Sequence, residues 1–185
     1  MCFSPFLFLK INFRLNLKLM KFIKATENDI PLIQNLARRS WEAAYAKILE
    51  REQIEYMLKT MYSHEEISNQ LQDPDYHYFL IFDELNNSFE GFLGYQHGYE
   101  QHTTKLHRIY LIPESKGKGI GKMAIDFLKQ KVSENHDRRI ILNVNKNNNA
   151  KMFYESQGFE VYKEIIVDIG SGFVMNDYEM EFYIT

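Results

Sequence analysis

The 185-residue sequence predicts a single α/β (α+β) domain, and three observations support this fold class. Strand-like apolar runs alternate with helical patterns in the order strand, helices, three strands, helix, strand, helix, two strands. Two pairs of strand-like runs are joined by short turns, which is typical of antiparallel hairpins. The length suits one hydrophobic core, because a domain of this size buries roughly 70% of its unfolded surface.

The first residues are unusual for a domain start. The apolar run at 6–9 resembles a short signal core, but basic residues interrupt it and no small-residue cleavage site follows. The segment is either an extra piece with strand-like alternation or a leader added by an upstream start codon. The second interpretation is favoured, because the sequence from Met20 reads as a complete domain start. We expect residues 1–19 to be a disordered extension or leader and 20–185 to be the domain.

The part that follows Met20 is mainly helical. A short strand at Phe22 and Ile23 precedes Thr26, whose side chain suits a helix cap. Apolar residues then recur at helical spacing, which predicts helices over 30–48, 52–61 and 64–71.

The remainder of the sequence alternates strands with helices. The predicted strands fall at 76–82, 89–98, 106–112, 139–144, 160–168 and 173–184. Helices are predicted from Ile120 and over 147–157, the second closed by Gly158 as a C-cap. The turn 170–172 joins the last two strands into a hairpin.

The segment 106–128 predicts a phosphate site. A strand ends at Pro113, a glycine-rich turn follows, and a helix opens at Ile120. Backbone N–H groups in such a turn and at a helix start bind anions. The expected contacts are Lys116, Gly117, Lys118, Gly119, Ile120, Gly121 and Lys122. The spacing fits neither a Walker A loop nor a dinucleotide fingerprint, and a tight turn without a ligand is the alternative.

The loop KGKGIG and the segment VNKNNNAKMFYESQGF together resemble motifs of the GNAT superfamily of acetyl-CoA-dependent N-acetyltransferases. Lys116 stands where the family pattern has Gln or Arg, while Gly119 and Gly121 match it. The resemblance extends over roughly 20–185. It implies a mixed, mostly antiparallel sheet with helices on both faces and a splayed central strand pair. Three further segments, at 40–45, 142–146 and 169–181, are similar to the PaiA-like polyamine acetyltransferases.

This resemblance implies roles for individual residues. Acetyl-CoA would be the cosubstrate, and a free N–H of Leu111 or Ile112 would polarise its thioester carbonyl. Tyr154 would be the general acid for the leaving thiolate, with core packing as the alternative. Asn147 would approach the coenzyme or only cap a helix.

The acceptor side is less defined by the sequence. Trp41 and Tyr45 either wall an acceptor pocket or pack at helix ends, and Glu42, Asp177 and Glu179 offer negative charge to a cationic amine. The sequence leaves four candidates for the general base, namely Glu100, Tyr110, Glu114 and a chain of water molecules. Three histidines spaced five apart do not form a zinc ligand set, so no metal is expected.

We expect transfer of an acetyl group to a small-molecule amine, a polyamine or another small cationic amine. The alternatives are acetylation of a protein lysine or N-terminus, and a non-catalytic acyl-CoA-binding sensor. The net charge of −3 gives no case for a nucleic-acid partner, and no apolar run is long enough for a membrane span. The single cysteine, Cys2, suits a reducing, cytoplasmic setting. Aromatic residues in the last strands permit a homodimer.

Overall fold

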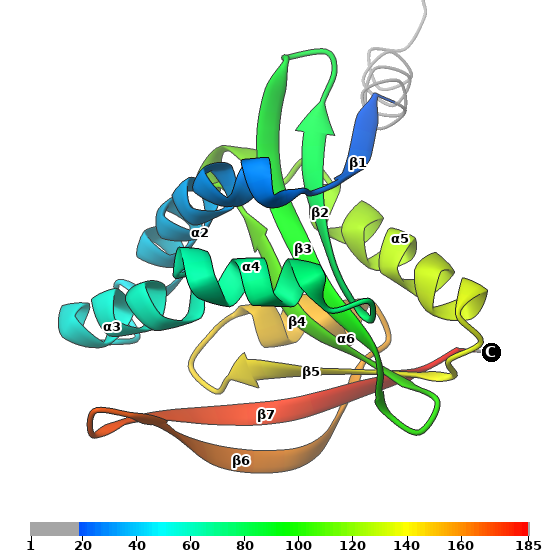
Figure 1. Ribbon diagram of the computed structural model, residues 1–185. Coiled ribbons are helices and arrows are strands. Elements are labelled where there is room, and N and C mark those ends of the chain that lie inside the picture. Colours follow the sequence, from blue (N-terminus) through cyan, green and yellow to red (C-terminus); the bar gives the residue numbers. More distant parts are fainter. Residues whose placement is uncertain (1–18, 185) are drawn as a thin grey trace, which may run out of the picture.

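The computed structural model describes residues 19–184, which form one strongly twisted seven-stranded sheet with helices on both faces (Figure 1). The strands are β1 (Met20–Lys24), β2 (Tyr76–Asp83), β3 (Ser88–Glu100), β4 (Thr103–Leu111), β5 (Arg139–Asn145), β6 (Glu160–Gly170) and β7 (Phe173–Tyr183). The α-helices are α2 (Ile30–Tyr45), α3 (Arg51–Met61), α4 (His64–Gln72), α5 (Ile120–Glu134) and α6 (Ala150–Ser156). Two short 3-10 helices are η1 (Glu27–Asp29) and η2 (Pro113–Ser115).

The sheet is mixed and mostly antiparallel, as the sequence predicts. Its strand order is β1-β2-β3-β4-β5-β7-β6, and β4 and β5 form the parallel pair. These two central strands pair only where Thr103–Leu106 faces Arg139–Leu142. Beyond that point β4 stays on β3 and β5 stays on β7, so the two strands diverge. The predicted splay is therefore confirmed.

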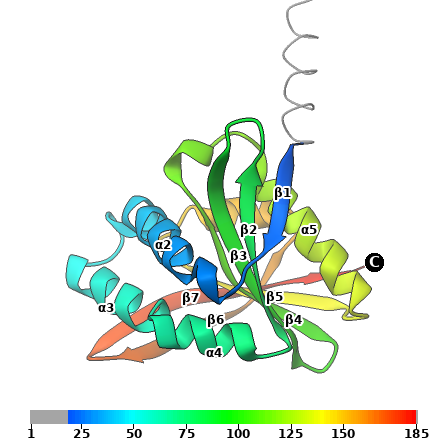
Figure 2. The ribbon, with the colours of Figure 1, turned by 45° about the horizontal axis from the view of Figure 1, so that its top comes forward.

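Two hydrophobic cores lie on opposite faces of the sheet. Helices α2, α3 and α4 cover one face, around fully buried side chains such as Ile33 and Trp41. Helices α5 and α6 cover the other, around Leu128, Tyr154 and Phe159. Figures 1 and 2 show α5 on the side of the sheet away from α2–α4.

Two helix boundaries differ from the prediction, and local hydrogen bonds explain both. Helix α2 ends at Tyr45 rather than at residue 48, because the Tyr45 carbonyl accepts the N–H groups of Ile48 and Leu49 in a turn. Helix α6 begins at Ala150 instead of residue 147. The Asn148 side-chain oxygen accepts the Ala150 N–H at 2.9 Å. Asn149 is thus the N-cap residue, and the side-chain bond at the helix start comes from Asn148 rather than from Asn147.

The short strand expected at Phe22 and Ile23 is present as β1. Strand β1 begins at Met20 and pairs with β2, and the Leu19 carbonyl accepts the Glu84 N–H at 3.0 Å. The expected extension over 1–19 lies outside the described residues apart from Leu19. Within residues 19–184, no helix is long and apolar enough to cross a membrane.

Candidate active site

A set of free backbone N–H groups surrounds the glycine loop. Gly117 and Gly119 have φ values of 78° and 73°, the left-handed region that glycine adopts without strain. The first bond of α5 runs from the Met123 N–H to the Gly119 carbonyl at 3.2 Å. The N–H groups before Met123 therefore have no partner within the helix, and the helix dipole adds positive charge. This cradle fits a pyrophosphate.

A cleft of about 430 Å³ opens beside this cradle. Its lining includes Lys116, Gly117, Gly119, Ile120, Gly121 and Lys122 from the predicted set. A Cβ at Gly121 would lie 3.2 Å from the Phe153 ring, so glycine also lets α6 approach the loop closely.

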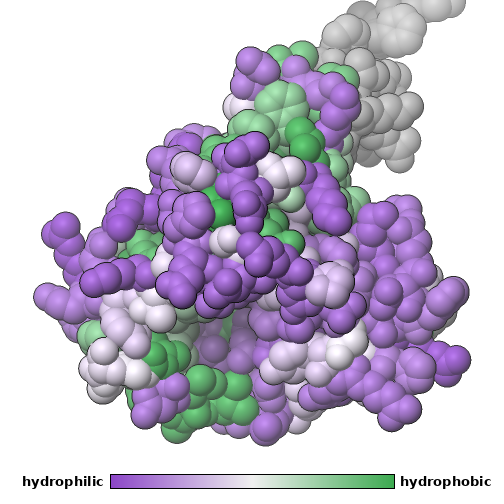
Figure 3. Space-filling model, viewed as in Figure 1, coloured by the Kyte–Doolittle hydropathy of each residue, from purple (hydrophilic) through white to green (hydrophobic). Residues whose placement is uncertain are grey.

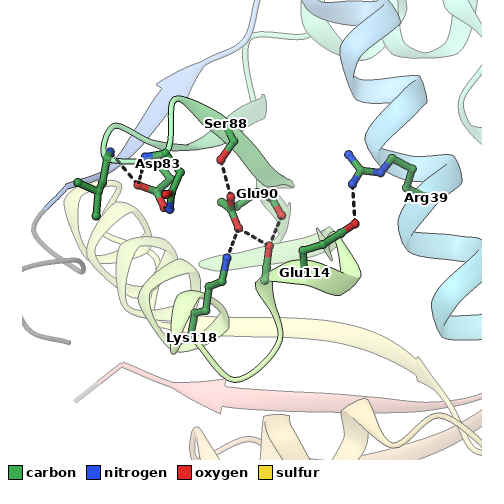
Figure 4. A network of polar contacts seen from close by, with 9 residues as sticks. Arg39, Asp83, Ser88, Glu90, Glu114 and Lys118 are labelled. Atoms are coloured by element: carbon green, nitrogen blue, oxygen red, sulfur yellow. Dashed lines mark hydrogen bonds and ion pairs between the residues drawn. The ribbon is translucent and has the colours of Figure 1, made fainter. Parts of the chain in front are cut away.

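Lys118 does not join that cleft. Its ammonium lies 3.3 Å from the buried carboxylate of Glu90 on β3, on the other side of the loop (Figure 4). Burial alone would raise the pKa of Glu90, but hydrogen bonds from Ser88 and Ser115 and the Lys118 charge outweigh it and lower this pKa. The sequence grouped Lys118 with the cleft residues; its side chain instead fastens the loop to the sheet.

The two expected N–H donors on β4 point in opposite directions. The Ile112 N–H donates to the Glu90 carbonyl at 2.9 Å, so it is not free for a ligand. Successive N–H groups of a strand alternate in direction, which leaves the Leu111 N–H on the side of β5. At Leu111 the two strands have already separated, because their pairing ends at Leu106. Of the two predicted donors, only Leu111 faces the open wedge.

Tyr154 lies on α6 at the junction of two cavities. It lines the loop cleft and a second cavity, of about 170 Å³, between β4 and β5. Its side chain is buried, and burial raises the pKa of its hydroxyl well above the ordinary value. In the described part of the chain, no residue forms a hydrogen bond with this hydroxyl. It is a neutral phenol with its proton available to a ligand.

A third cavity, of about 220 Å³, adjoins the second on the side of α2 and α3. Tyr45 and Tyr110 line both, so they form the shared wall. Burial raises the pKa of Tyr45 to about 12 and the pKa of Tyr110 well above its ordinary value, so both are neutral. Trp41 closes another side, with its indole N–H 3.2 Å from the Tyr62 hydroxyl.

Asp177 places a carboxylate in this third cavity. It lies on β7 and is 7% exposed, and within residues 19–184 its carboxylate accepts one side-chain hydrogen bond, from the Asn145 amide at 3.4 Å. Burial raises the pKa of the carboxyl to about 6, and the Asn145 bond opposes the rise only in part. The structure therefore brings Asp177 together with Trp41 and Tyr45, as predicted from the sequence.

Glu42 is not part of this group. It is exposed and lies 3.6 Å from Arg38 in an ion pair along α2. Trp41 and Tyr45 are four residues apart and share one face of the helix, whereas Glu42 is turned away by about 100°. The predicted role of Glu42 at the acceptor side is therefore wrong.

The suggested carboxylate bases are also engaged elsewhere. Glu100 pairs with Arg139 at 3.0 Å, and Glu114 pairs with Arg39 at 3.1 Å. Both carboxylates are largely exposed and line neither the second nor the third cavity.

Sequence reasoning missed His107 and Asn148. His107 lines both inner cavities, bonds the Gln96 side chain at 3.2 Å, and has its pKa lowered to about 3 by burial. It is a bulged residue of β4, and neither strand periodicity nor spacing indicates such a position. Across residues 19–184, no three His, Cys, Asp or Glu residues come close enough together to hold a metal ion.

Comparisons with known proteins agree with this geometry. Residues 45–182 match the family described as "Acetyltransferase (GNAT) domain". An uncharacterized N-acetyltransferase from the pepI 3' region of Lactobacillus delbrueckii subsp. lactis is 23% identical over 159 residues, which cover 82% of this chain and 90% of that protein.

Solved structures show the same architecture. The PaiA N-acetyltransferase from Thermoplasma acidophilum, crystallised in complex with coenzyme A, superposes with a TM-score of 0.75 at 25% identity, covering 89% of this chain and 99% of that one. A variant of the spermidine N-acetyltransferase SpeG from Vibrio cholerae has a TM-score of 0.66 at 17% identity, covering 90% and 94%. Since the family match spans most of the sequence, the chain belongs to the GNAT family and is an acetyl-CoA-dependent N-acetyltransferase.

Proposed function

We propose that the protein acetylates a primary amine of a small cationic molecule of the polyamine class, by direct attack of that amine on acetyl-CoA. One observation carries the proposal. The cavity that holds Asp177 adjoins the cavity that Tyr154 lines, and Tyr45 and Tyr110 belong to both. An amine bound at Asp177 thus lies next to the place where the strands diverge.

Different groups of the protein act in the successive steps of the reaction. The cradle N–H groups hold the pyrophosphate of acetyl-CoA, whose thioester supplies an activated acetyl group. The Leu111 N–H donates a hydrogen bond to the thioester carbonyl oxygen and stabilises the negative charge that builds up there. The Tyr154 hydroxyl gives its proton to the departing thiolate. Asn147 lies in the turn before α6, and we keep it as a coenzyme contact in this proposal.

The chemistry of the third cavity supports a small cationic acceptor. A buried carboxylate attracts an ammonium group, and the faces of Trp41, Tyr45 and Tyr110 offer cation–π contacts. The volume of about 220 Å³ suits an aliphatic chain better than an extended peptide. Among the solved structures that share this fold, SpeG is named as a spermidine N-acetyltransferase, and spermidine is a polyamine.

A thiol-release assay with acetyl-CoA and a panel of acceptors tests this proposal. The panel contains spermidine, spermine, short monoamines, and peptides with a free lysine or N-terminus. We expect the highest kcat/KM for the polyamines. A preference for the peptides would replace the proposal with protein acetylation.

A further inference from the structure

A protonated amine must lose a proton before it can attack a thioester. The pKa of such an amine is near 10.4 for a lysine-like group, so at pH 7 less than about one molecule in a thousand is neutral. A general base within reach of the ammonium removes this handicap and typically contributes 10²–10⁴-fold in rate.

Asp177 is the anionic group that lines the third cavity, which we call the acceptor cavity. Its position is fixed by strand pairing on both sides, with Asn145 opposite on β5 and Ile165 opposite on β6. The Asn145 amide donates at 3.4 Å to one carboxylate oxygen, Oδ1. No hydrogen bond from another described residue occupies the second oxygen, Oδ2.

The other titratable groups around the cavity do not compete for this role. Tyr45 from α2 and Tyr110 from β4 are neutral phenols, and His107 from β4 is a neutral imidazole whose pKa is too low for a base. Lys105 from β4 directs its ammonium to the Tyr99 hydroxyl at 3.2 Å. The cavity residues from α3 and β6 are apolar, namely Met57, Met61, Val167 and Ile169.

We infer that Asp177 is the general base of the reaction, and that Asn145 positions its carboxylate. This inference rests on the proposed function, because it assumes an ammonium acceptor in the cavity. The raised pKa supports it: a carboxyl with a pKa of about 6 is ionised at pH 7, yet it is a stronger base than an ordinary aspartate.

The proton balance closes with these residues. The ammonium gives one proton to the Asp177 carboxylate, and the neutral nitrogen then forms a bond to the thioester carbon. The carbon–sulfur bond breaks as Tyr154 protonates the sulfur. The new amide nitrogen sheds its second proton, which restores the Tyr154 phenol, and Asp177 releases its proton to solvent. The net products are the acetylated amine, free coenzyme A and one proton.

The test is a pH profile of kcat/KM for the amine, for the wild-type enzyme and for Asp177→Asn, which keeps size and shape. We expect the wild-type profile to rise through about pH 6, the pKa of the carboxyl. The variant should lose this limb and be roughly 10²-fold slower or more at pH 7. Its rate should then rise about tenfold per pH unit toward the amine pKa near 10.4, where it approaches the wild type.

Two controls make the result specific. Glu179→Gln changes a carboxylate two residues along the same strand, which pairs with Lys163 at 3.4 Å outside the cavity, and should keep the wild-type profile. Asn145→Ala should move the acidic limb to higher pH, because the hydrogen bond from Asn145 lowers the Asp177 pKa.

The possible outcomes separate the two ideas. A wild-type to Asp177→Asn ratio that stays constant between pH 7 and 10 would show that Asp177 only binds the amine, and would overturn the base role while leaving the proposed function intact. No thiol release by the wild-type enzyme with any small amine would overturn the proposed function itself.

Discussion

At the residue scale, the proposed chemistry depends most on the Tyr154 hydroxyl, the general acid. It is a buried, neutral phenol that meets both the loop cleft and the cavity between the splayed strands. An acid that protonates a thiolate must hold its proton at the operating pH, and burial ensures that here.

Tyr154→Phe removes this proton and little else. We expect kcat to fall roughly 10²-fold or more, with the KM for acetyl-CoA nearly unchanged, because the ring still packs against Phe153 and Phe159. Steady-state thiol release measures both parameters. Tyr162→Phe, which changes an exposed tyrosine on β6, is the control. Unchanged kcat in Tyr154→Phe would remove Tyr154 from the acid role.

The buried Asp177 carboxyl also has a cost in stability. Its pKa is raised from 3.8 to about 6 in the folded protein, so the folded state disfavours the ionised form. Below pH 3.8 the carboxyl is protonated in both states and there is no penalty. Above pH 6 it is ionised in both states, and the full penalty, at most about 3 kcal/mol, is present.

Asp177→Asn should therefore be more stable than the wild type at pH 8, by up to about 3 kcal/mol in the free energy of unfolding. The difference should shrink as the pH falls from 6 toward 4. Urea titrations at several pH values measure it, with the exposed carboxyl variant Glu160→Gln as the control. A variant that is less stable than the wild type at pH 8 would contradict the assigned burial penalty.

At the scale of elements, the N-terminus of α5 is expected to hold the pyrophosphate. The chain offers a matched pair of glycines for testing it. Gly117 in the loop and Gly172 in the β6–β7 turn have φ values of 78° and 79°, and a Cβ at either would meet no atom within 4 Å.

Alanine at either position should cost a similar roughly 1–2 kcal/mol of stability, because both backbones are left-handed. Only Gly117→Ala should also raise the KM for acetyl-CoA, by about tenfold, since Gly117 lines the cleft and Gly172 does not. Thermal unfolding and acetyl-CoA titrations measure the two effects. Equal KM values for the two variants would argue against pyrophosphate binding at this loop.

A second element, the β6–β7 hairpin, forms one wall of the acceptor cavity. Helix α3 holds it: the Tyr56 hydroxyl donates to the Ile169 carbonyl at 2.8 Å, and the Gln53 side chain donates to the Val174 carbonyl at 2.9 Å. On the face shown in Figure 3, hydrophobic side chains gather over the tip of this hairpin beside a hollow.

Tyr56→Phe should loosen this wall without touching the coenzyme cleft. We expect the KM for the amine to rise several-fold and the KM for acetyl-CoA to stay constant, because one hydrogen bond of about 1 kcal/mol is lost. Tyr183→Phe, an exposed tyrosine at the other end of β7, serves as the control. A parallel rise in both KM values would mean that the hairpin does not act on the acceptor alone.

The sequence predicts elements well where the signal is local. The α5 start follows from the glycine turn and the helical spacing after Ile120, and the last hairpin follows from its turn at 170–172. The start of α6 was misplaced because three consecutive asparagines each suit a cap, and only the fold shows that Asn148 is the one that bonds Ala150.

At the scale of the whole molecule, element order and two motifs were enough to predict the fold, including the splay of β4 from β5. The acceptor cavity was only partly predictable, because it gathers residues from α2, α3, β4, β5, β6 and β7. No local pattern shows that Asp177 points into it, whereas helical spacing alone turns Glu42 about 100° away from Trp41. The placement of Asp177 depends on long-range packing.

We propose that an acetyl group passes from acetyl-CoA to a small cationic amine in the wedge between the diverging strands. The most direct measurement incubates the purified enzyme with acetyl-CoA and spermidine and quantifies free thiol and acetylated amine together, by thiol titration and mass spectrometry. We expect one acetylated amine for each thiol released, and almost no thiol without the amine. Thiol release that is independent of spermidine, or no acetylated product, would contradict it.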